Sequence, residues 1–316
     1  MPAVCGRIGL SEAPLHTPGA PTSAVILREH KRVEGFAPGN LCAKGGRAAH
    51  SSGKILSVCL AAFVAALMLA LTLTAQTADD TGAKNARQAR AALDAMVQAL
   101  GGPAWLNMKN QMRQGHVAAF FHGKPSGGTT EYWEFHAWPD QDRIEYTKHR
   151  DVVQFYLGRE GWEVTYRGKK PLPQEQVDDY LRRRDHSIET VVKSWLNDPQ
   201  TILIYEGQRL AERHLAEQVT LISARNEAVT ILTDVQTHLP LRRSFEWRDP
   251  VYKDKDLDAE EYDDYHVVNG LPTPFTITRF KNDDMIRQYF LDRATYNQDF
   301  AQDFWSVDAA DRRIKK

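Results

Sequence analysis

The spacing of hydrophobic positions predicts one amphipathic helix before Gly101 and a change of period after it. The apolar stripe of this helix is Leu93, Met96, Val97 and Leu100, at positions i, i+3, i+4 and i+7. Gly101-Gly102 and Pro103 end the helix. Beyond it the period becomes two, since Trp133 and Phe135 alternate with Glu134 and His136. Such alternation is typical of a strand.

The second half of the chain continues the strand pattern. Further strands are predicted at Val219–Ala224, Glu227–Asp234, Leu241–Arg248, Tyr262–Val268, Pro274–Phe280 and Met285–Ala294. Two helices, Pro173–His186 and Ser187–Asn197, interrupt the strands, and Ser187 is suited to cap the second one. The predicted order is one helix, some five strands, two helices and about seven strands. The fold class is therefore mainly β with helices (α+β), and the antiparallel hairpins favour a sandwich or a barrel.

A run without charged side chains, Ile55–Ala75, lies before this domain and follows Lys44, Arg47 and Lys54. A basic flank, an apolar core and a small polar exit are the parts of a secretory signal, here residues 55–78. An uncleaved run would instead anchor the protein in the inner membrane, because about 20 apolar residues span a bilayer. Residues 1–54 are rich in Pro and Gly and predict a disordered leader, unless translation starts later. The domain is residues 79–316, and we expect it in the periplasm.

Charge and cysteine content narrow the partners of residues 79–316. Acidic residues outnumber basic ones there, which argues against a nucleic-acid surface. Cys5, Cys42 and Cys59 all precede the domain, so no disulfide can form within it.

The search for catalytic and metal motifs gives no candidate. The sequence has no G-x-S-x-G, no H-E-x-x-H and no paired-cysteine zinc pattern. Asp254, Asp256 and Asp258 alternate, but the sixth and twelfth places of a calcium loop hold Ala259 and Tyr265, so a solvated acidic loop is the interpretation. Arg182-Arg183-Arg184 is interpreted as an ordinary charged helix face. No metal, cofactor or catalytic residue is expected.

Several local patterns together resemble the LolA-like family of periplasmic lipoprotein-localisation and lipid-binding proteins. The patterns are Gly101-Gly102-Pro103 after a helix, Tyr132–Pro139, Gly158–Gly161 followed by Trp162 and Tyr166, Val229–Asp234 followed by Thr237–Pro240, Tyr265–Gly270 followed by Leu271, Pro272 and Pro274, and Asn297 with Phe300. They extend over about residues 88–305. One position departs from the lipoprotein carrier, where an Arg before the Pro latches the lid, because Trp138 stands there in this chain.

The resemblance implies a half-open antiparallel barrel with an N-terminal helix, a helical lid and an apolar cavity. The implied ligands are acyl chains of lipids or lipoproteins, with an inner- or outer-membrane protein as a further partner and with no catalysis. Aromatic and apolar strand positions are the candidates for the cavity wall: Trp133, Phe135, Trp162, Phe245, Trp247, Phe275 and Ile277. The candidates for the lid are Val177, Tyr180, Leu181, Val192 and Trp195. Without an Arg at position 138, apolar contact is expected to hold the lid closed.

Two other classes of function remain open at this stage. One is a periplasmic hydrolase that uses carboxylates such as Glu131, Glu134 or Asp264. The other is a structural or interaction module tethered by an uncleaved Ile55–Ala75. A cavity lined without charge would favour the carrier, and two carboxylates in a polar cleft would favour the hydrolase.

Overall fold

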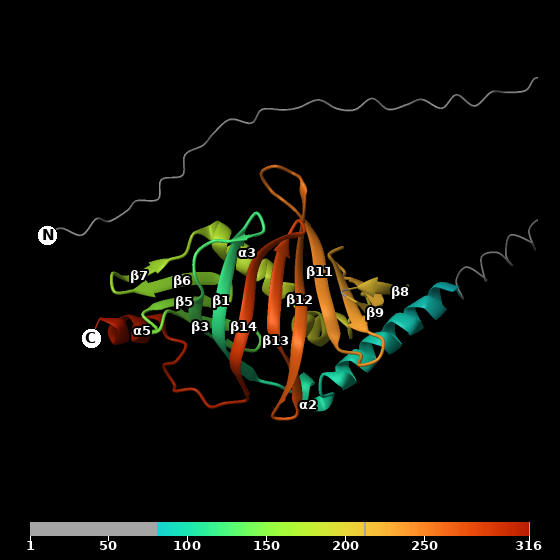
Figure 1. Ribbon diagram of the computed structural model, residues 1–316, viewed down its shortest axis with the longest axis horizontal. Helices are drawn as coiled ribbons and strands as arrows, with labels where there is room; N and C mark the ends of the chain where they lie inside the picture. Colours follow the sequence, from blue (N-terminus) through green and yellow to red (C-terminus); the bar gives the residue numbers. More distant parts are fainter. Residues whose placement is uncertain (1–80, 212, 316) are drawn as a thin grey trace, which may run out of the picture. The chain divides into compact units, whose positions relative to one another are not determined.

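The computed structural model describes residues 81–211 and 213–315 (Figure 1). The chain divides into two units, residues 1–62 and 63–316, and every described residue belongs to the second unit. The predicted leader and signal segment therefore lie outside the described residues. Within the described part of the chain, no helix is both long enough and apolar enough to cross a membrane.

A large antiparallel sheet forms the domain. Its strands are β1 (Asn110–Phe121), β2 (Lys124–Pro125), β3 (Thr130–Ala137), β4 (Gln141–Tyr146), β5 (Val152–Leu157), β6 (Glu160–Thr165), β7 (Gly168–Pro171), β8 (Ile202–Ala211), β9 (His214–Ile222), β10 (Ala228–Asp234), β11 (Pro240–Arg248), β12 (Lys255–Val268), β13 (Leu271–Lys281) and β14 (Asp284–Tyr296). Besides a helix at residues 81–99, the helical elements are α2 (Pro103–Leu106), α3 (Gln174–Asp185), α4 (Ile188–Thr190), the π-helix η1 (Val191–Trp195) and α5 (Val307–Ile314).

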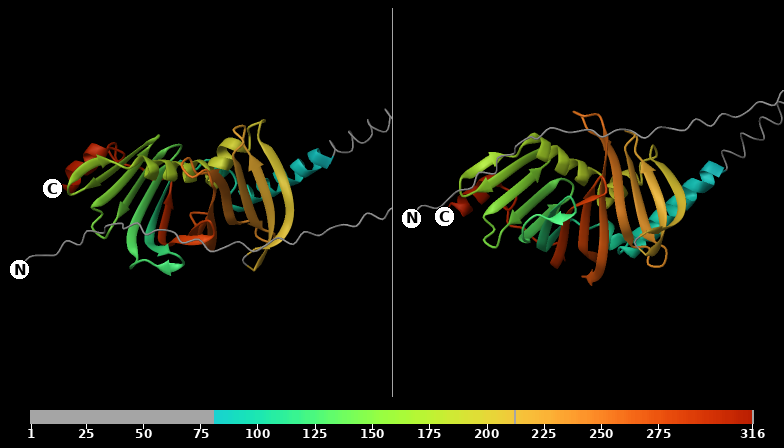
Figure 2. Two further views of the ribbon diagram at one scale, coloured as in Figure 1. Left: turned by 90° about the horizontal axis from the view of Figure 1, so that it is seen from above. Right: turned by 45° about the horizontal axis from the view of Figure 1, so that its top comes forward.

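The strand order makes the sheet an open, curved layer. It runs β7-β6-β5-β4-β3-β1-β14-β13-β12-β11-β10-β9-β8, and β2 pairs only with β1. The first strand, β1, pairs with the last strand, β14, in the middle of the sheet. The strands from the middle of the sequence, β7 and β8, therefore form its free edges. The segment from α3 to η1, which we call the helical cover (residues 174–195), connects these edges and crosses the concave face (Figure 2). The predicted half-open α+β architecture is confirmed.

The N-terminal helix is predicted correctly and packs against the helical cover. Its four stripe residues, Leu93, Met96, Val97 and Leu100, are all buried in one cluster with Val192 and Trp195 of η1 and strand residues of β9 to β11. The helix ends where predicted, because Gly101 and Gly102 both have positive φ, which costs glycine little. The amide of Gly102 donates to the carbonyl of Val97, which satisfies one terminal acceptor.

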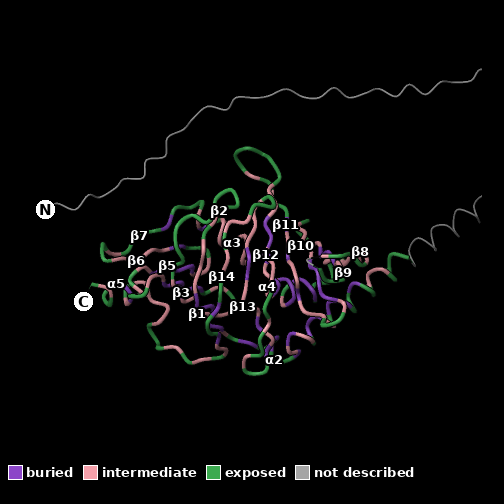
Figure 3. The backbone as a smooth tube through the Cα atoms, viewed as in Figure 1, coloured by how far each residue is buried: buried purple, intermediate pink, exposed green. Residues whose placement is uncertain are grey.

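A second cover, on the convex face of β3 to β6, is not predicted from the sequence. It consists of residues 297–315, including α5, which contacts β6 and β7. Phe304 packs edge-on against Phe135 of β3, and its carbonyl accepts a hydrogen bond from the buried guanidinium of Arg143. These strands are therefore buried on both faces (Figure 3). Five of the six strands with predicted bounds are longer than predicted, and β10 is one residue shorter. β8, for which no bounds were predicted, completes the expected number of about seven strands after the helices.

Candidate functional site

The concave face and the helical cover enclose two adjoining cavities. The first, of about 140 Å³, is lined by Arg243 and its neighbours, and we call it the Arg243 compartment. The second, of about 430 Å³, includes Arg287 and is called the Arg287 compartment. Six residues line both: Tyr132, Glu134, Tyr180, Arg183, Arg279 and Tyr289. Because these residues are shared, the two compartments form one candidate ligand site beneath α3.

Charged side chains form a ladder across the floor of the Arg243 compartment. Strand register places Arg243 opposite Glu260, and Glu260 opposite Arg279. The Glu260 carboxylate accepts from Arg243 at 2.8 Å and from Arg279 at 2.7 Å. Burial favours the protonated form of Glu260, but the two guanidinium groups hold its pKa well below the usual range. One carboxylate thus stands between two arginines, and the ladder carries an excess positive charge.

Tyrosine hydroxyls surround this ladder. Tyr262 and Tyr289 line the Arg243 compartment, and Tyr289 accepts a hydrogen bond from Arg279 at 2.8 Å. Burial, followed by the charge of Glu260, raises the pKa of Tyr262 far above its ordinary value. Burial likewise raises the pKa of Tyr180. The hydroxyls of Tyr262 and Tyr180 therefore remain protonated at neutral pH, and Tyr262 donates its proton to the Glu260 carboxylate at 3.0 Å.

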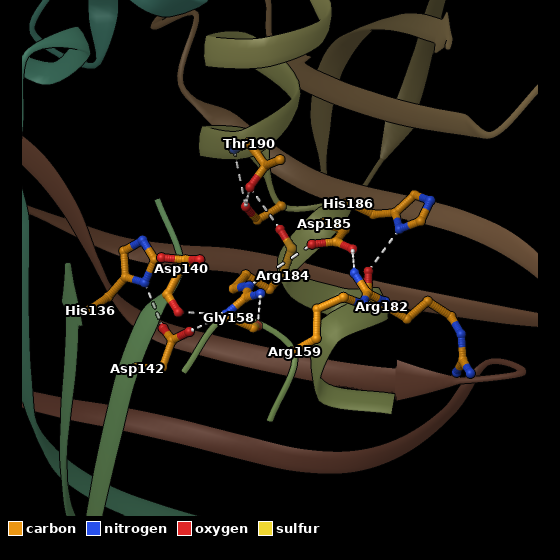
Figure 4. Close-up of polar contacts among 11 residues, drawn as sticks. His136, Asp140, Asp142, Gly158, Arg159, Arg182, Arg184, Asp185, His186 and Thr190 are labelled. Atoms are coloured by element: carbon orange, nitrogen blue, oxygen red, sulfur yellow. Dashed lines mark hydrogen bonds and ion pairs between the residues drawn. The ribbon is translucent and has the colours of Figure 1, made fainter. Parts of the chain in front are cut away.

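The helical cover is latched to the sheet by Arg184 of α3 (Figure 4). Its guanidinium donates to Asp142 Oδ2 at 3.0 Å, to the carbonyl of Gly158 at 2.8 Å and to that of Asp140 at 3.2 Å. Asp142 is itself buried, and its other oxygen lies 2.6 Å from Nδ1 of His136 on β3. A carboxylate and two backbone carbonyls of the sheet thus hold one cation of the cover.

Two sequence interpretations are amended here. Mainly apolar contact is expected to hold the lid, and the structure adds a polar contact, because Arg184 of the cover pairs with Asp142 of the sheet. Arg182-Arg183-Arg184 is not an ordinary solvated face, because Arg182 lies 3.4 Å from the ring centroid of Trp247 and Arg183 lines both compartments. The sequence shows only that three basic residues are adjacent on a helix. All three contact the sheet or its cavity because the sheet curves around α3.

Trp138, which stands where the carrier family has its latching Arg, still contacts the cover. The ammonium of Lys193 on η1 lies 4.3 Å from the centroid of its ring. Lys193 also donates to the carbonyl of Met108 at 3.1 Å. This position therefore takes part in cover–sheet contact through a cation–π interaction.

The predicted wall residues fall into two groups. Ile277 lines the Arg243 compartment, while Phe245 and Trp247 lie on the concave face under α3, where Phe245 stacks on His186. Phe245 and Trp247 line neither compartment, and neither do the other four: Trp133, Phe135 and Trp162 lie on the convex side with the C-terminal cover, and Phe275 packs against His266. Since successive strand residues face opposite sides, Tyr132, Glu134 and His136 line the cavity in place of Trp133 and Phe135.

The predicted lid residues all belong to the helical cover. Val177 and Leu181 are buried against Ile144 and Tyr156, and Tyr180 stacks on Tyr156 with a centroid distance of 3.6 Å. Val192 and Trp195 pack against the N-terminal helix. Gly161 permits the close approach of α3, because a Cβ at this position would lie 2.4 Å from Cγ2 of Val177.

The acidic run of β12 differs from its sequence interpretation. Asp256 bonds to Lys281 and Asn282, and the buried Asp258 accepts from the indole of Trp247 at 2.6 Å, so neither belongs to a solvated loop. Among the described residues, no group of three or more His, Cys, Asp or Glu is arranged to hold a metal ion. The site residues that sequence reasoning missed, Arg184, Arg243, Glu260 and Arg279, carry no local motif that would have marked them.

His186, at the junction of α3 and α4, predicts a pH dependence of stability. Burial lowers its pKa, outweighing the hydrogen bond between its Nδ1 and the carbonyl of Arg182. Between this lowered pKa and the ordinary value near 6.5, the unfolded chain binds the proton and the folded chain does not. The free energy of unfolding should therefore fall as the pH is lowered from 7.5 towards 5.5. Urea unfolding of wild type and His186→Phe tests this, and an equal pH dependence in both would contradict it.

Comparison with known proteins concerns the fold. No protein-family model matches the chain, and no curated protein matches it in sequence. The structure of a DUF1329 family protein from Desulfovibrio piger superposes with a TM-score of 0.50 at 10% identity, covering 72% of this chain and 99% of that chain. At this identity the likeness shows the fold alone.

Two further solved structures are similar at lower scores. A putative outer membrane lipoprotein-sorting protein domain from Vibrio parahaemolyticus has a TM-score of 0.44 at 8% identity, covering 74% of this chain and 99% of that chain. A LolA superfamily protein from Nitrosomonas europaea has a TM-score of 0.44 at 12% identity, covering 71% of this chain and 99% of that chain.

Proposed function

We propose that this protein is an exported, non-catalytic binding protein or carrier for acyl chains of lipids or lipoproteins. The observation that carries the proposal is the pair of adjoining compartments between the concave face and a latched helical cover. The helical cover connects the two free edges of the curved sheet. We expect an acyl chain to enter when the cover moves away from the sheet, and water to be excluded when the cover closes. Each methylene of a chain buried there contributes about 0.8 kcal/mol to binding.

The expectation of an apolar cavity lined without charge is wrong, because arginines and carboxylates line both compartments. The apolar part of the lining is what supports a chain as the ligand. Leu100, Trp105 and Met108 contribute from the N-terminal helix, α2 and the segment after it, and Ile188 from the helical cover. Ile277 and the prolines of β13 complete this side of the Arg243 compartment. An apolar side beside a charged floor suits an amphiphile better than a polar metabolite.

The hydrolase alternative has less support. Of the three carboxylates named for it, only Glu134 lines the compartments. Glu134 lies 3.5 Å from Arg113, so this charge is already neutralised by a neighbour. A tethered interaction module would be expected to have no cavity, whereas two compartments are present.

Export through residues 55–78 is part of the proposal. N-terminal sequencing of protein recovered from the periplasm should begin between about Gln76 and Asp80, since small residues precede the polar exit there. Full-length protein in the membrane fraction would support the anchored form instead. A partner protein in the inner or the outer membrane, as in lipoprotein sorting, is also part of the proposal.

Displacement of a fluorescent fatty acid tests the binding proposal. Protein purified after expression of the full chain should bind the probe saturably, and unlabelled amphiphiles should displace it. If no acyl probe binds saturably, the carrier proposal fails and the interaction-module alternative takes its place.

A further inference from the structure

We propose that the Arg243 compartment recognises an anionic headgroup, a carboxylate or a phosphate, of the bound amphiphile. This inference rests on the proposed function, because the headgroup belongs to the molecule whose chain the compartments would bury. The expected ligands are therefore acyl compounds that carry a negative charge at one end. Their neutral analogues would bind less tightly.

The first observation is an arginine with unused hydrogen-bond donors in a buried place. The side chain of Arg243 is 1% exposed and lines the compartment. Its Nη2 pairs with Glu260, but among the described residues neither Nε nor Nη1 has a hydrogen-bond partner. A buried cationic donor without a partner is costly, and these two nitrogens point to different sides of the guanidinium. An anion that enters the compartment would therefore supply a charged partner to one of them.

The second observation is the charge balance of the ladder. Glu260 is the single carboxylate bonded to both Arg243 and Arg279, so one positive charge remains on the floor of the compartment. Burying an uncompensated charge is unfavourable unless an opposite charge approaches it. An anion beside Arg243 would complete an alternating row of cation and anion.

Other charged groups also face the Arg243 compartment. Glu134 pairs with Arg113, and Asp142 pairs with Arg184, so these two carboxylates are already matched. Glu189 of α4 also lines the compartment and lies on the cover instead of on the floor. Its charge would oppose an anion beside it, which directs the headgroup towards the sheet side, where Arg243 lies.

The size of the compartment agrees with a headgroup. Its volume of about 140 Å³ resembles that of cavities which hold one benzene-sized molecule. A carboxylate or phosphate is smaller than benzene, so the group fits with a short length of chain. The neighbouring Arg287 compartment, of about 430 Å³, and the apolar side of the lining leave room for the remaining chain.

The test compares a fluorescent fatty acid with the fatty alcohol of the same chain and label. The full-length wild-type protein should bind the acid about 10- to 100-fold more tightly, the range expected for hydrogen bonds to a charged group. Arg243→Gln should remove most of this preference, because it weakens binding of the acid far more than binding of the alcohol. Arg242→Gln is the matched control, because this neighbour on β11 pairs with Glu261 and lines neither compartment, so its preference should equal that of wild type.

Two further arms make the result decisive. Arg279→Gln repeats the test if Arg243→Gln does not fold, and it should also reduce the preference for the acid. Competition distinguishes the source of the anion: an acylated phosphate should displace the acid at far lower concentration than inorganic phosphate. Equal binding of acid and alcohol by wild type, or inorganic phosphate competing as well as its acylated form, would overturn the headgroup proposal. Failure of both probes to bind would instead overturn the proposed function.

Discussion

Replacing Arg184 with Met should lower the free energy of unfolding by about 3–5 kcal/mol, the cost of breaking a buried ion pair by removing one partner. The side chains of Arg184 and Asp142 are 10% and 4% exposed, so Asp142 would be left as a buried charge with His136 and Tyr180 beside it. Two carbonyl groups, of Asp140 and Gly158, would lose their donor as well. Chemical denaturation measures the loss. Hydrogen exchange in residues 174–190 should also accelerate, because the latch holds this segment on the sheet.

Arg159→Met is the matched control for this prediction. Arg159 lies in the same region (Figure 4), but its side chain is 75% exposed and its distance to Asp185 is 3.6 Å. Exposed ion pairs contribute about 0–1 kcal/mol, so this variant should unfold almost like wild type. Similar losses in both variants would show that Arg184 has no special role in holding the cover.

Replacing Trp195 with Ala should cost about 3–5 kcal/mol of stability, as for other large buried side chains. Trp195 is buried in the cluster that joins η1 to the N-terminal helix, and its ring meets His186 edge-on at 5.7 Å. Since it anchors the end of the helical cover, its loss should also weaken binding of an acyl probe by admitting water.

Trp162→Ala serves as the control, because Trp162 lies on the convex side with α5. It should lower stability without changing probe affinity. If Trp195→Ala and wild type bind the probe equally, the cavity remains but the cover does not control access to it.

The sequence predicts those parts of the fold that depend on local pattern. The stripe from Leu93 to Leu100 and the two glycines after it predict a helix and its end, and Ser187 caps α4 through a hydrogen bond to the amide of Thr190. The alternation on β3 predicts a strand correctly. It does not show which of its two faces meets the lumen, because the C-terminal segment buries the other face too. Trp133 and Phe135 were therefore placed on the wall, where Tyr132 and Glu134 lie.

The charged part of the site could not be predicted for a different reason. Arg243, Glu260 and Arg279 come from three strands, and only the register of β11, β12 and β13 brings them side by side. Arg184 and Asp142 are likewise separated by a length of chain that includes the whole of β5, β6 and β7. Local sequence contains no record of such pairs, since each residue alone resembles a surface charge. The polar latch and the charge ladder therefore emerge only from tertiary structure.

Native mass spectrometry of protein recovered from the cells that naturally make it tests the central claim most directly. The account predicts a fraction of molecules with an added mass equal to an acyl-bearing lipid, released when the protein is unfolded. Arg184→Met should retain less of this added mass than wild type does, since the cover would be open more often. A single unliganded mass for wild type, together with no uptake of added lipids, would contradict the account.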